Sequence, residues 1–339
     1  MGKAVVVGAA GFTGRLTTQE LSRLGVPALL VGRSGATVAA LAQATGYEHV
    51  VVADGAEIRP LLAPGDVVVS MAGPFVDHGY GPLGAALDAG AHYLDSSGEH
   101  AFIQRVFAGY DAAARNADAL VVPAMAADWV PGNLAGAIAL AAAGDEASAI
   151  DIRYIVTGTS FVISRGSAQT GARIVQRQVP PFVWRDGRLV AGSHESIRFD
   201  YAGESRSGRS VAGTEHFGLP SLCGSLRDIY TYISFPPTAL PSGVEVDGPS
   251  PEQRAGNRQR IVATVSDRNG DQVVEVTLDG PNSYDYSGRM LAEGAQRLLA
   301  GDCHARGVRA PVQAFGFDTL MASSEAAGMF RVPIERSPS

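Results

Sequence analysis

The stretch "VVVGAAGFTGRL", Val5 to Leu16, places three glycines three residues apart directly behind a run of valines. The valines predict a buried strand, and the residues after the second glycine predict the start of a helix. In such a turn the first glycine permits the tight bend, the second lets the backbone approach a pyrophosphate, and the third lets helix and strand pack closely. The alternative is a flexible turn in a chain that has 41 glycines. We expect a dinucleotide to bind at Gly8, Gly11, Phe12, Thr13 and Gly14.

The end of the second predicted strand indicates which dinucleotide binds. An acidic residue there would accept a hydrogen bond from the ribose 2′-hydroxyl of NAD, whereas a basic residue accommodates the 2′-phosphate of NADP. The sequence supplies Arg33 and Ser34 and no acid before Glu48. A guanidinium beside a hydroxyl suits a phosphate, so NADPH is the expected cofactor. The alternative for Arg33 is a solvated arginine in a loop.

The first 125 or so residues alternate short β-rich runs with segments of helical spacing, which is typical of a parallel sheet covered by crossover helices. The predicted strands are Ala4 to Val7, Ala28 to Val31, Val50 to Ala53, Val67 to Met71, His92 to Asp95 and Leu120 to Pro123. The pattern predicts an α/β fold with a doubly wound, Rossmann-type parallel sheet.

After a predicted helix that runs from Pro131 through Ala143, the pattern changes to longer β-like stretches with hairpin turns. The segments Ile261 to Asp267 and Gln272 to Asp279 flank an Asn-Gly turn, a strong hairpin signal. This half predicts an α+β domain with a largely antiparallel sheet. We expect a nucleotide-binding domain over residues 1–130, a substrate or dimerisation domain over 131–285, and a helical segment over 286–339 that packs back on the first domain.

Composition excludes several classes of function. The 339 residues are 46% apolar and 18% charged, and the formal net charge of -7 disfavours a nucleic-acid partner. The most apolar region, 119–143, is interrupted by polar residues and by Pro131, so no stable membrane insertion is expected. Cys223 and Cys303 form no metal-binding spacing, and no signal-peptide pattern is present. We expect a cytoplasmic protein without a bound metal, acting on a small molecule and open to forming a homodimer.

Longer segments carry a family resemblance. "VVVSMAGPFVDHGYGPLGAALDAGAHYLDSSGE", Val67 to Glu99, resembles the strand, Gly-Pro-Phe loop, helix and Tyr-x-Asp-x-x-Gly-Glu segment of the saccharopine dehydrogenase-like NADP-binding oxidoreductases. That family includes saccharopine reductases and trans-acting enoyl reductases. Further similar segments are "DWVPGN" from Asp128, "SRGSAQT" from Ser164 and "YSGRMLAEGAQRLLAG" from Tyr286. Where the family often reads Gly-Phe-Asp, this chain has Ala126 and Ala127 before the aspartate.

The resemblance to enoyl reductases implies an NADPH-dependent reductase that acts on a C=C bond of a small to medium apolar substrate. An imine or opine-type reductase of amino-acid metabolism is an alternative, and it would need a carboxylate clamp of arginines, for which Arg153, Arg165, Arg173 and Arg177 are candidates. A non-catalytic NADPH-binding protein is a third reading.

In a doubly wound sheet the loops after the strand ends line the ligand site. We therefore expect further cofactor contacts from Asp54, Ala72, Gly73, Pro74 and Phe75. The alternative for Asp54 is to cap the next helix.

Hydride transfer needs a proton donor or an oxyanion-binding group. The residues predicted to surround the cofactor are His78, Tyr80, Tyr93, Asp95, Glu99 and Asp128. From these the catalytic candidates are His78, Tyr80 and Asp128. For Asp95 and Glu99 we favour orienting a loop through backbone N–H groups. For Ser164, Arg165 and Ser167 we favour a helix cap and a solvated arginine over a ligand site. His216 in "GTEHFGLP" is a weaker candidate donor.

Overall fold

The computed structural model describes residues 2–158, 162–236, 243–245 and 248–332. Its first sheet is parallel in every pair and has the strand order β17-β6-β5-β4-β1-β2-β3. The strands are β1 (Ala4–Val7), β2 (Ala28–Gly32), β3 (Glu48–Val51), β4 (Val67–Ser70), β5 (His92–Asp95), β6 (Leu120–Val122) and β17 (Gly307–Val308). This order reverses direction at β1, so the doubly wound fold class is confirmed.

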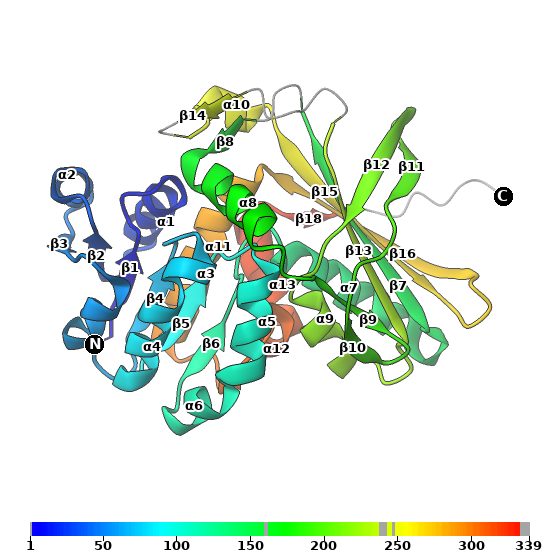
Figure 1. Cartoon of the computed structure of the whole chain (residues 1–339), viewed down its shortest axis with the longest axis horizontal. Helices are drawn as coiled ribbons and strands as arrows, with labels where there is room; N and C mark the ends of the chain where they lie inside the picture. The colour runs from blue at the N-terminus through cyan, green and yellow to red at the C-terminus, as the bar shows by residue number, and fades with distance from the viewer. Residues whose placement is uncertain (1, 159–161, 237–242, 246–247, 333–339) are drawn as a thin grey trace.

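Helices cover both faces of this sheet (Figure 1). They are α1 (Phe12–Arg23), α2 (Gly35–Thr45), α3 (Phe75–His78), α4 (Tyr80–Ala89), α5 (His100–Gly109) and α6 (Asp111–Asn116), with a 3₁₀ helix over Gly55–Leu61. Successive residues of one strand enter different cores: Val6 and Leu94 lie in one buried cluster, whereas Val5 and Tyr93 lie in the other. This alternation is what a strand covered on both faces requires.

The predicted third strand was placed two residues too late. Val50 to Ala53 was expected, but β3 begins at Glu48 and ends at Val51. The strand lies at the edge of the sheet and is mostly exposed, so its polar first residues did not match a buried-strand pattern. The two-residue β17 was not predicted, because two residues carry no periodicity.

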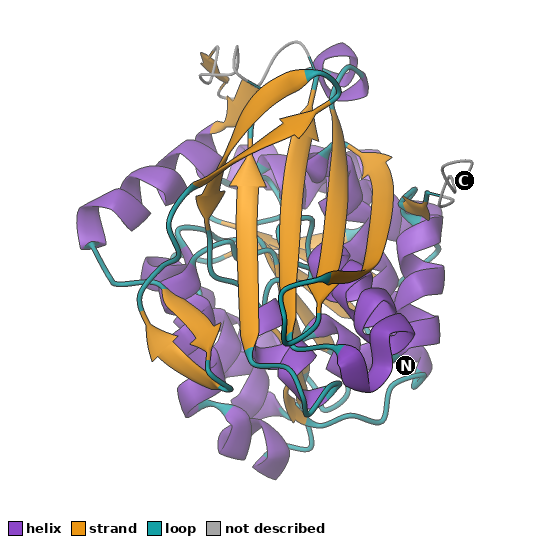
Figure 2. Ribbon diagram, turned by 90° about the vertical axis from the view of Figure 1, so that its right-hand side faces the viewer, coloured by secondary structure: helices purple, strands orange, loops and turns teal. Residues whose placement is uncertain are grey.

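The second sheet is mixed and has the path β10-β9-β13-β7-β15-β16-β18, with β12 pairing β13 and β11 pairing β12. Its strands are β7 (Ala149–Thr157), β9 (Phe182–Arg185), β10 (Arg188–Ala191), β11 (Ile197–Tyr201), β12 (Glu204–Ser210), β13 (Asp228–Ser234), β15 (Arg258–Ser266), β16 (Gln272–Pro281) and β18 (Phe330–Arg331). The predicted Asn-Gly hairpin is β15 and β16. The β7–β13 pair is parallel, the others are antiparallel, and Figure 2 shows the long strands face-on with helices behind them.

The remaining elements lie between and around the two large sheets, and two of them, β8 and β14, pair in a separate parallel sheet. They are α7 (Val130–Ala143), β8 (Val162–Ser164), α8 (Arg165–Arg177), α9 (Glu215–Gly218), β14 (Gly243–Glu245), α10 (Pro251–Ala255), α11 (Ser283–Ala300), α12 (Pro311–Phe315) and α13 (Phe317–Ala326), with 3₁₀ helices over Gly144–Glu146 and Leu219–Ser221. Twelve of the fourteen α7 residues are buried, and α7 contacts β7, β15 and β16. Its apolar sequence therefore reflects burial on nearly all sides.

One hydrophobic cluster runs from Val6 of the first sheet to Ile150 and Ile261 of the second. Helix α11 packs mainly on α1 and also contacts β4 and β5. The division into domains at residues 130 and 285 stays a prediction. Within the described part of the chain, no helix combines the length and the apolar character needed to cross a bilayer.

Candidate active site at the carboxyl edge of the parallel sheet

The glycine loop has no room for side chains at two of its three glycines. Gly8 has φ +79°, and a Cβ there would lie 3.0 Å from the Met71 carbonyl carbon. A Cβ on Gly14 would lie 2.2 Å from the Gly8 carbonyl oxygen. The turn is therefore tight against the β4 loop, and α1 begins close to the edge of the sheet.

The first turn of α1 is suited to an anion. No side chain caps it and no acidic residue lies in it, so its N–H groups and its positive dipole end are unopposed. The Phe12 ring packs edge-on against Tyr284 at 4.9 Å, and the Arg254 guanidinium lies 5.6 Å from it. The Phe12 side chain therefore contacts residues from the second half of the chain. Its backbone N–H lies in the uncapped first turn and can bind a phosphate.

Arg33 and Ser34 lie exposed just after β2, on the turn into α2. Within the described residues Arg33 has no hydrogen-bond or ion-pair partner, and the Ser34 hydroxyl lies 3.0 Å from that of Thr37. A free guanidinium next to a hydroxyl fits a 2′-phosphate. Asp54 accepts a hydrogen bond from the Ala56 N–H at 2.8 Å and caps the 3₁₀ helix that follows. Capping was the alternative to a coenzyme contact for this residue.

Two buried carboxylates hold the loops at this edge. Glu99 accepts hydrogen bonds from the N–H groups of Phe75 (2.5 Å) and Val76 (3.0 Å), which fixes the end of the loop over Ala72, Gly73 and Pro74. Asp95 accepts from the N–H groups of Ser97 (2.9 Å) and Ala124 (2.7 Å). The expectation that both orient loops through backbone groups is confirmed.

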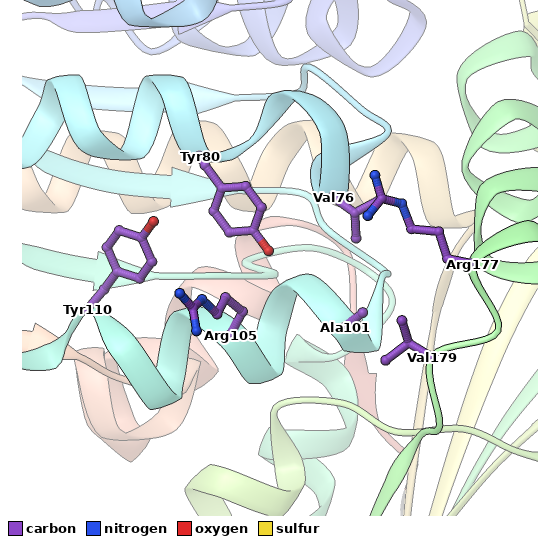
Figure 3. A pocket seen from close by; sticks show the side chains of 7 residues that line it. All are labelled: Val76, Tyr80, Ala101, Arg105, Tyr110, Arg177 and Val179. Atoms are coloured by element: carbon purple, nitrogen blue, oxygen red, sulfur yellow. The ribbon is translucent and has the colours of Figure 1, made fainter.

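The three predicted catalytic residues lie in different surroundings. His78 is exposed at the end of α3. The Tyr80 ring lies 5.0 Å from that of Phe102 and is stacked at 6.3 Å on Tyr110, in a pocket on the helix face of the sheet (Figure 3). Tyr80 thus lines this pocket, whereas Asp128 lies against the loop after β5.

Asp128 follows β6 and lies against the loop after β5. A Cβ on Gly98 would come 2.8 Å from its Oδ2 atom. The Asp128 side chain is exposed, yet desolvation raises its pKa to about 6. Both facts fit a carboxyl group in a recess, where water touches it but protein replaces most of the surrounding solvent. No cation contributes to this shift, which leaves the group close to protonation near neutral pH.

A buried pair lies behind Asp128. The Tyr154 hydroxyl accepts a hydrogen bond from the Gly132 N–H at 2.9 Å and donates a short one to Glu215 Oε1. Burial and the negative charge of Asp128 raise the pKa of Glu215 to about 8, so it is protonated at neutral pH. Gly132 has no space for a side chain, since a Cβ would collide with both partners.

Polar atoms around this pair lack partners within the described residues. They are Glu215 Oε2, His216 Nε2, Asn133 Oδ1 and Trp129 Nε1. Burial lowers the pKa of His216 to about 4, so this ring is neutral and cannot serve as a cationic donor at neutral pH. Sequence reasoning missed Tyr154 and Glu215. Glu215 stands beside His216 in a segment that was noted, whereas Tyr154 is one aromatic residue in a strand and gives no signal.

Ser164 caps α8 by accepting a hydrogen bond from the Ser167 N–H at 3.2 Å, and Arg165 is exposed. The expectation that Ser164 caps a helix and that Arg165 is a solvated arginine is therefore confirmed. Helix α8 then crosses to the Rossmann-type half, where Arg173 and Arg177 both pair with Asp77 of α3.

Comparison with known proteins agrees with this arrangement. Residues 4–122 match the family model described as the saccharopine dehydrogenase NADP binding domain. A Mycobacterium tuberculosis protein provisionally named a trans-acting enoyl reductase is 33% identical over 139 residues. An Arabidopsis thaliana protein provisionally named a mitochondrial saccharopine dehydrogenase-like oxidoreductase is 28% identical over 148 residues. Each match covers 38% of this chain and 33% of the relative, so the chain spans about a third of these relatives' length.

The fold extends the similarity beyond the matched third. The saccharopine dehydrogenase (L-Glu forming) of Saccharomyces cerevisiae has a TM-score of 0.64 and 12% identity, covering 98% of this chain and 100% of that one. This likeness concerns the fold. Residues 4–122 are therefore similar to the saccharopine dehydrogenase NADP binding domain, and the chain as a whole shares the fold of a saccharopine dehydrogenase.

Proposed function

We propose that this protein reduces a C=C bond conjugated to a carbonyl group in a small to medium apolar substrate, using NADPH. When bound, the coenzyme supplies the hydride that is added to one carbon of the double bond. Gly8, Gly11 and Gly14 hold the pyrophosphate against the first turn of α1, and Arg33 with Ser34 hold the 2′-phosphate. The remaining coenzyme contacts come from Thr13 and from the loop that ends at Phe75.

The residues of the chain then have to supply one proton to the other carbon of the former double bond. We assign this proton to Asp128, because it lies at the carboxyl edge of the sheet, is accessible, and has a pKa of about 6. Protonated Glu215 behind it limits the negative charge in the recess and, with Tyr154, fixes the wall of the site.

The observation that carries the choice of substrate class is the charge of this recess. Asp128 and Glu215 are acidic groups, and no Arg or Lys contributes to the pKa shift of either. An amino-dicarboxylate would bring further negative charge to a site without a cationic clamp, whereas a neutral enoyl group would not. The recess therefore supports enoyl reduction over the imine or opine-type alternative.

The experiment is NADPH oxidation with purified protein and a panel of α,β-unsaturated thioesters, imines and ketones. We expect turnover with the thioesters, and Asp128→Asn should lower kcat by about a hundredfold while leaving NADPH affinity unchanged. Since only protonated Asp128 donates, kcat of the native protein should fall as pH rises above about 6. The variant should lose this decline.

Asp145→Asn, a change of an exposed carboxylate beyond the end of α7, is the matched control and should retain full activity. Turnover of imines in place of thioesters would replace the enoyl assignment. Tight NADPH binding without turnover of any substrate would favour a binding protein. A cytoplasmic location and a homodimer complete the proposal; fractionation and sedimentation test them.

A further inference from the structure

A pocket of about 400 Å³ lies between α4, α5 and the end of α8, on the face of the parallel sheet that α4 and α5 cover (Figure 3). Its lining residues are Val76, Tyr80, Ala101, Arg105, Tyr110, Arg177 and Val179. None of the residues that we assign to the coenzyme lines it. This volume lies within the range of small-molecule sites, and the pocket is therefore a separate candidate for a ligand.

The charge of the pocket is positive although the chain as a whole carries -7. Arg105 has no hydrogen-bond or ion-pair partner within the described residues. Arg177 shares a single carboxylate, that of Asp77, with Arg173. Glu99 adds a second carboxylate close enough to act on Tyr80. Three guanidinium groups thus stand against two carboxylates, which leaves one excess positive charge for a ligand to neutralise.

Two phenol groups add hydrogen-bond donors. The rings of Tyr80 and Tyr110 are stacked with an interplanar angle of 12°. Burial raises the pKa of Tyr80, so its hydroxyl keeps its proton at neutral pH. Within the described part of the chain neither hydroxyl has a hydrogen-bond partner, and both can donate to an anion.

Apolar side chains border the charged groups. Val76, Ala101 and Val179 line the pocket itself. On the adjoining end of α8, Ile174 is 36% exposed and Val175 is 74% exposed. Apolar residues next to a cationic centre match a ligand that has both an anionic end and an apolar body.

We propose that this pocket binds an amphiphilic organic anion, with its charged end between Arg105 and Arg177 and its apolar body on Val76 and Val179. This site is distinct from the recess at Asp128, and its occupancy requires no chemistry at the coenzyme.

The test is a fluorescence titration with 8-anilinonaphthalene-1-sulfonate, an aromatic anion that becomes emissive in apolar surroundings. Saturating NADP⁺ keeps the probe out of the coenzyme site without adding its own emission. Arg105→Gln should weaken probe binding by about tenfold, the loss of one charge-assisted contact. Arg105 is exposed, so the variant should fold, and circular dichroism checks this.

Arg115→Gln is the matched control, because Arg115 is a nearby exposed arginine on α6 that does not line the pocket. It should leave the affinity unchanged. N-phenyl-1-naphthylamine, the uncharged analogue, should bind native protein and Arg105→Gln within about twofold of each other. Equal loss in both arginine variants, an unchanged affinity in Arg105→Gln, or no saturable binding of the sulfonate would overturn the proposal. None of these results depends on whether the protein reduces an enoyl substrate.

Discussion

Glu215 is a carboxyl group for which burial sets the protonation state. Its pKa rises from 4.5 to about 8 in the folded protein, so the folded state holds a proton that the unfolded chain releases above about pH 5. The contribution of Glu215 to the free energy of unfolding is therefore fully present below about pH 5, and it is lost as the pH rises through about 8.

Glu215→Gln removes this titration while keeping a partner for the Tyr154 hydroxyl. We expect the native protein to lose about 3 to 4 kcal/mol of unfolding free energy between about pH 5 and pH 8 that the variant retains. Urea unfolding across this range measures it. A parallel pH dependence in both proteins would show that Glu215 is not the titrating group.

We propose that the Arg33 side chain determines the preference for NADPH over NADH. Because its guanidinium has no protein partner within the described residues, Arg33→Ala should cost no native contact and should weaken NADPH binding by about 10- to 100-fold. NADH, which lacks the phosphate, should bind as before. Calorimetry with both coenzymes measures this, and Arg59→Ala, an exposed arginine of the same half, is the control. Equal loss of both coenzymes would remove the assignment.

At the scale of elements, α8 differs from the other long helices because none of its residues is buried. Its C-terminal half is tied to α3 by the Asp77 pairs, whereas Ser164 and Ser167 at its start contact the Tyr284 hydroxyl. A helix held by partly exposed ion pairs opens locally at little cost.

Asp77→Asn should therefore speed amide hydrogen exchange in residues 165–177 by roughly fivefold, with α5 exchange unchanged. Exchange followed by mass spectrometry reads both segments in one sample. Unchanged protection of α8 would mean that its other contacts suffice to hold it.

Elements with local signals were predictable. The glycine turn, the first two strands and the β15–β16 hairpin each have a pattern within a dozen residues, and the structure has them where expected. The parallel β7–β13 pair was missed, since those strands lie some 70 residues apart and no turn links them.

For the whole molecule, the sequence did not predict which segments far apart in the chain lie close together in space. Asp128 could be named from a motif, but its neighbours Tyr154 and Glu215 come from β7 and α9, whose proximity only the packing of α7 creates. His78 and Tyr80 follow β4, whose carboxyl end lies at the proposed site. The chain then turns into α3 and α4, which places Tyr80 in the pocket between α4 and α5.

The Rossmann-type half is completed late in the chain. One of its two edge strands, β17, pairs with β6, and α11 covers α1. Both β17 and α11 follow every strand of the second sheet except β18. During synthesis on a ribosome, the segment up to residue 130 therefore emerges with one side of α1 exposed. About 150 more residues must be synthesised before α11 can cover that side. Nascent chains stalled in that interval should expose apolar surface to chaperones and hold NADPH poorly, and a nonsense codon before α11 should abolish the nucleotide site as well as the segment it deletes.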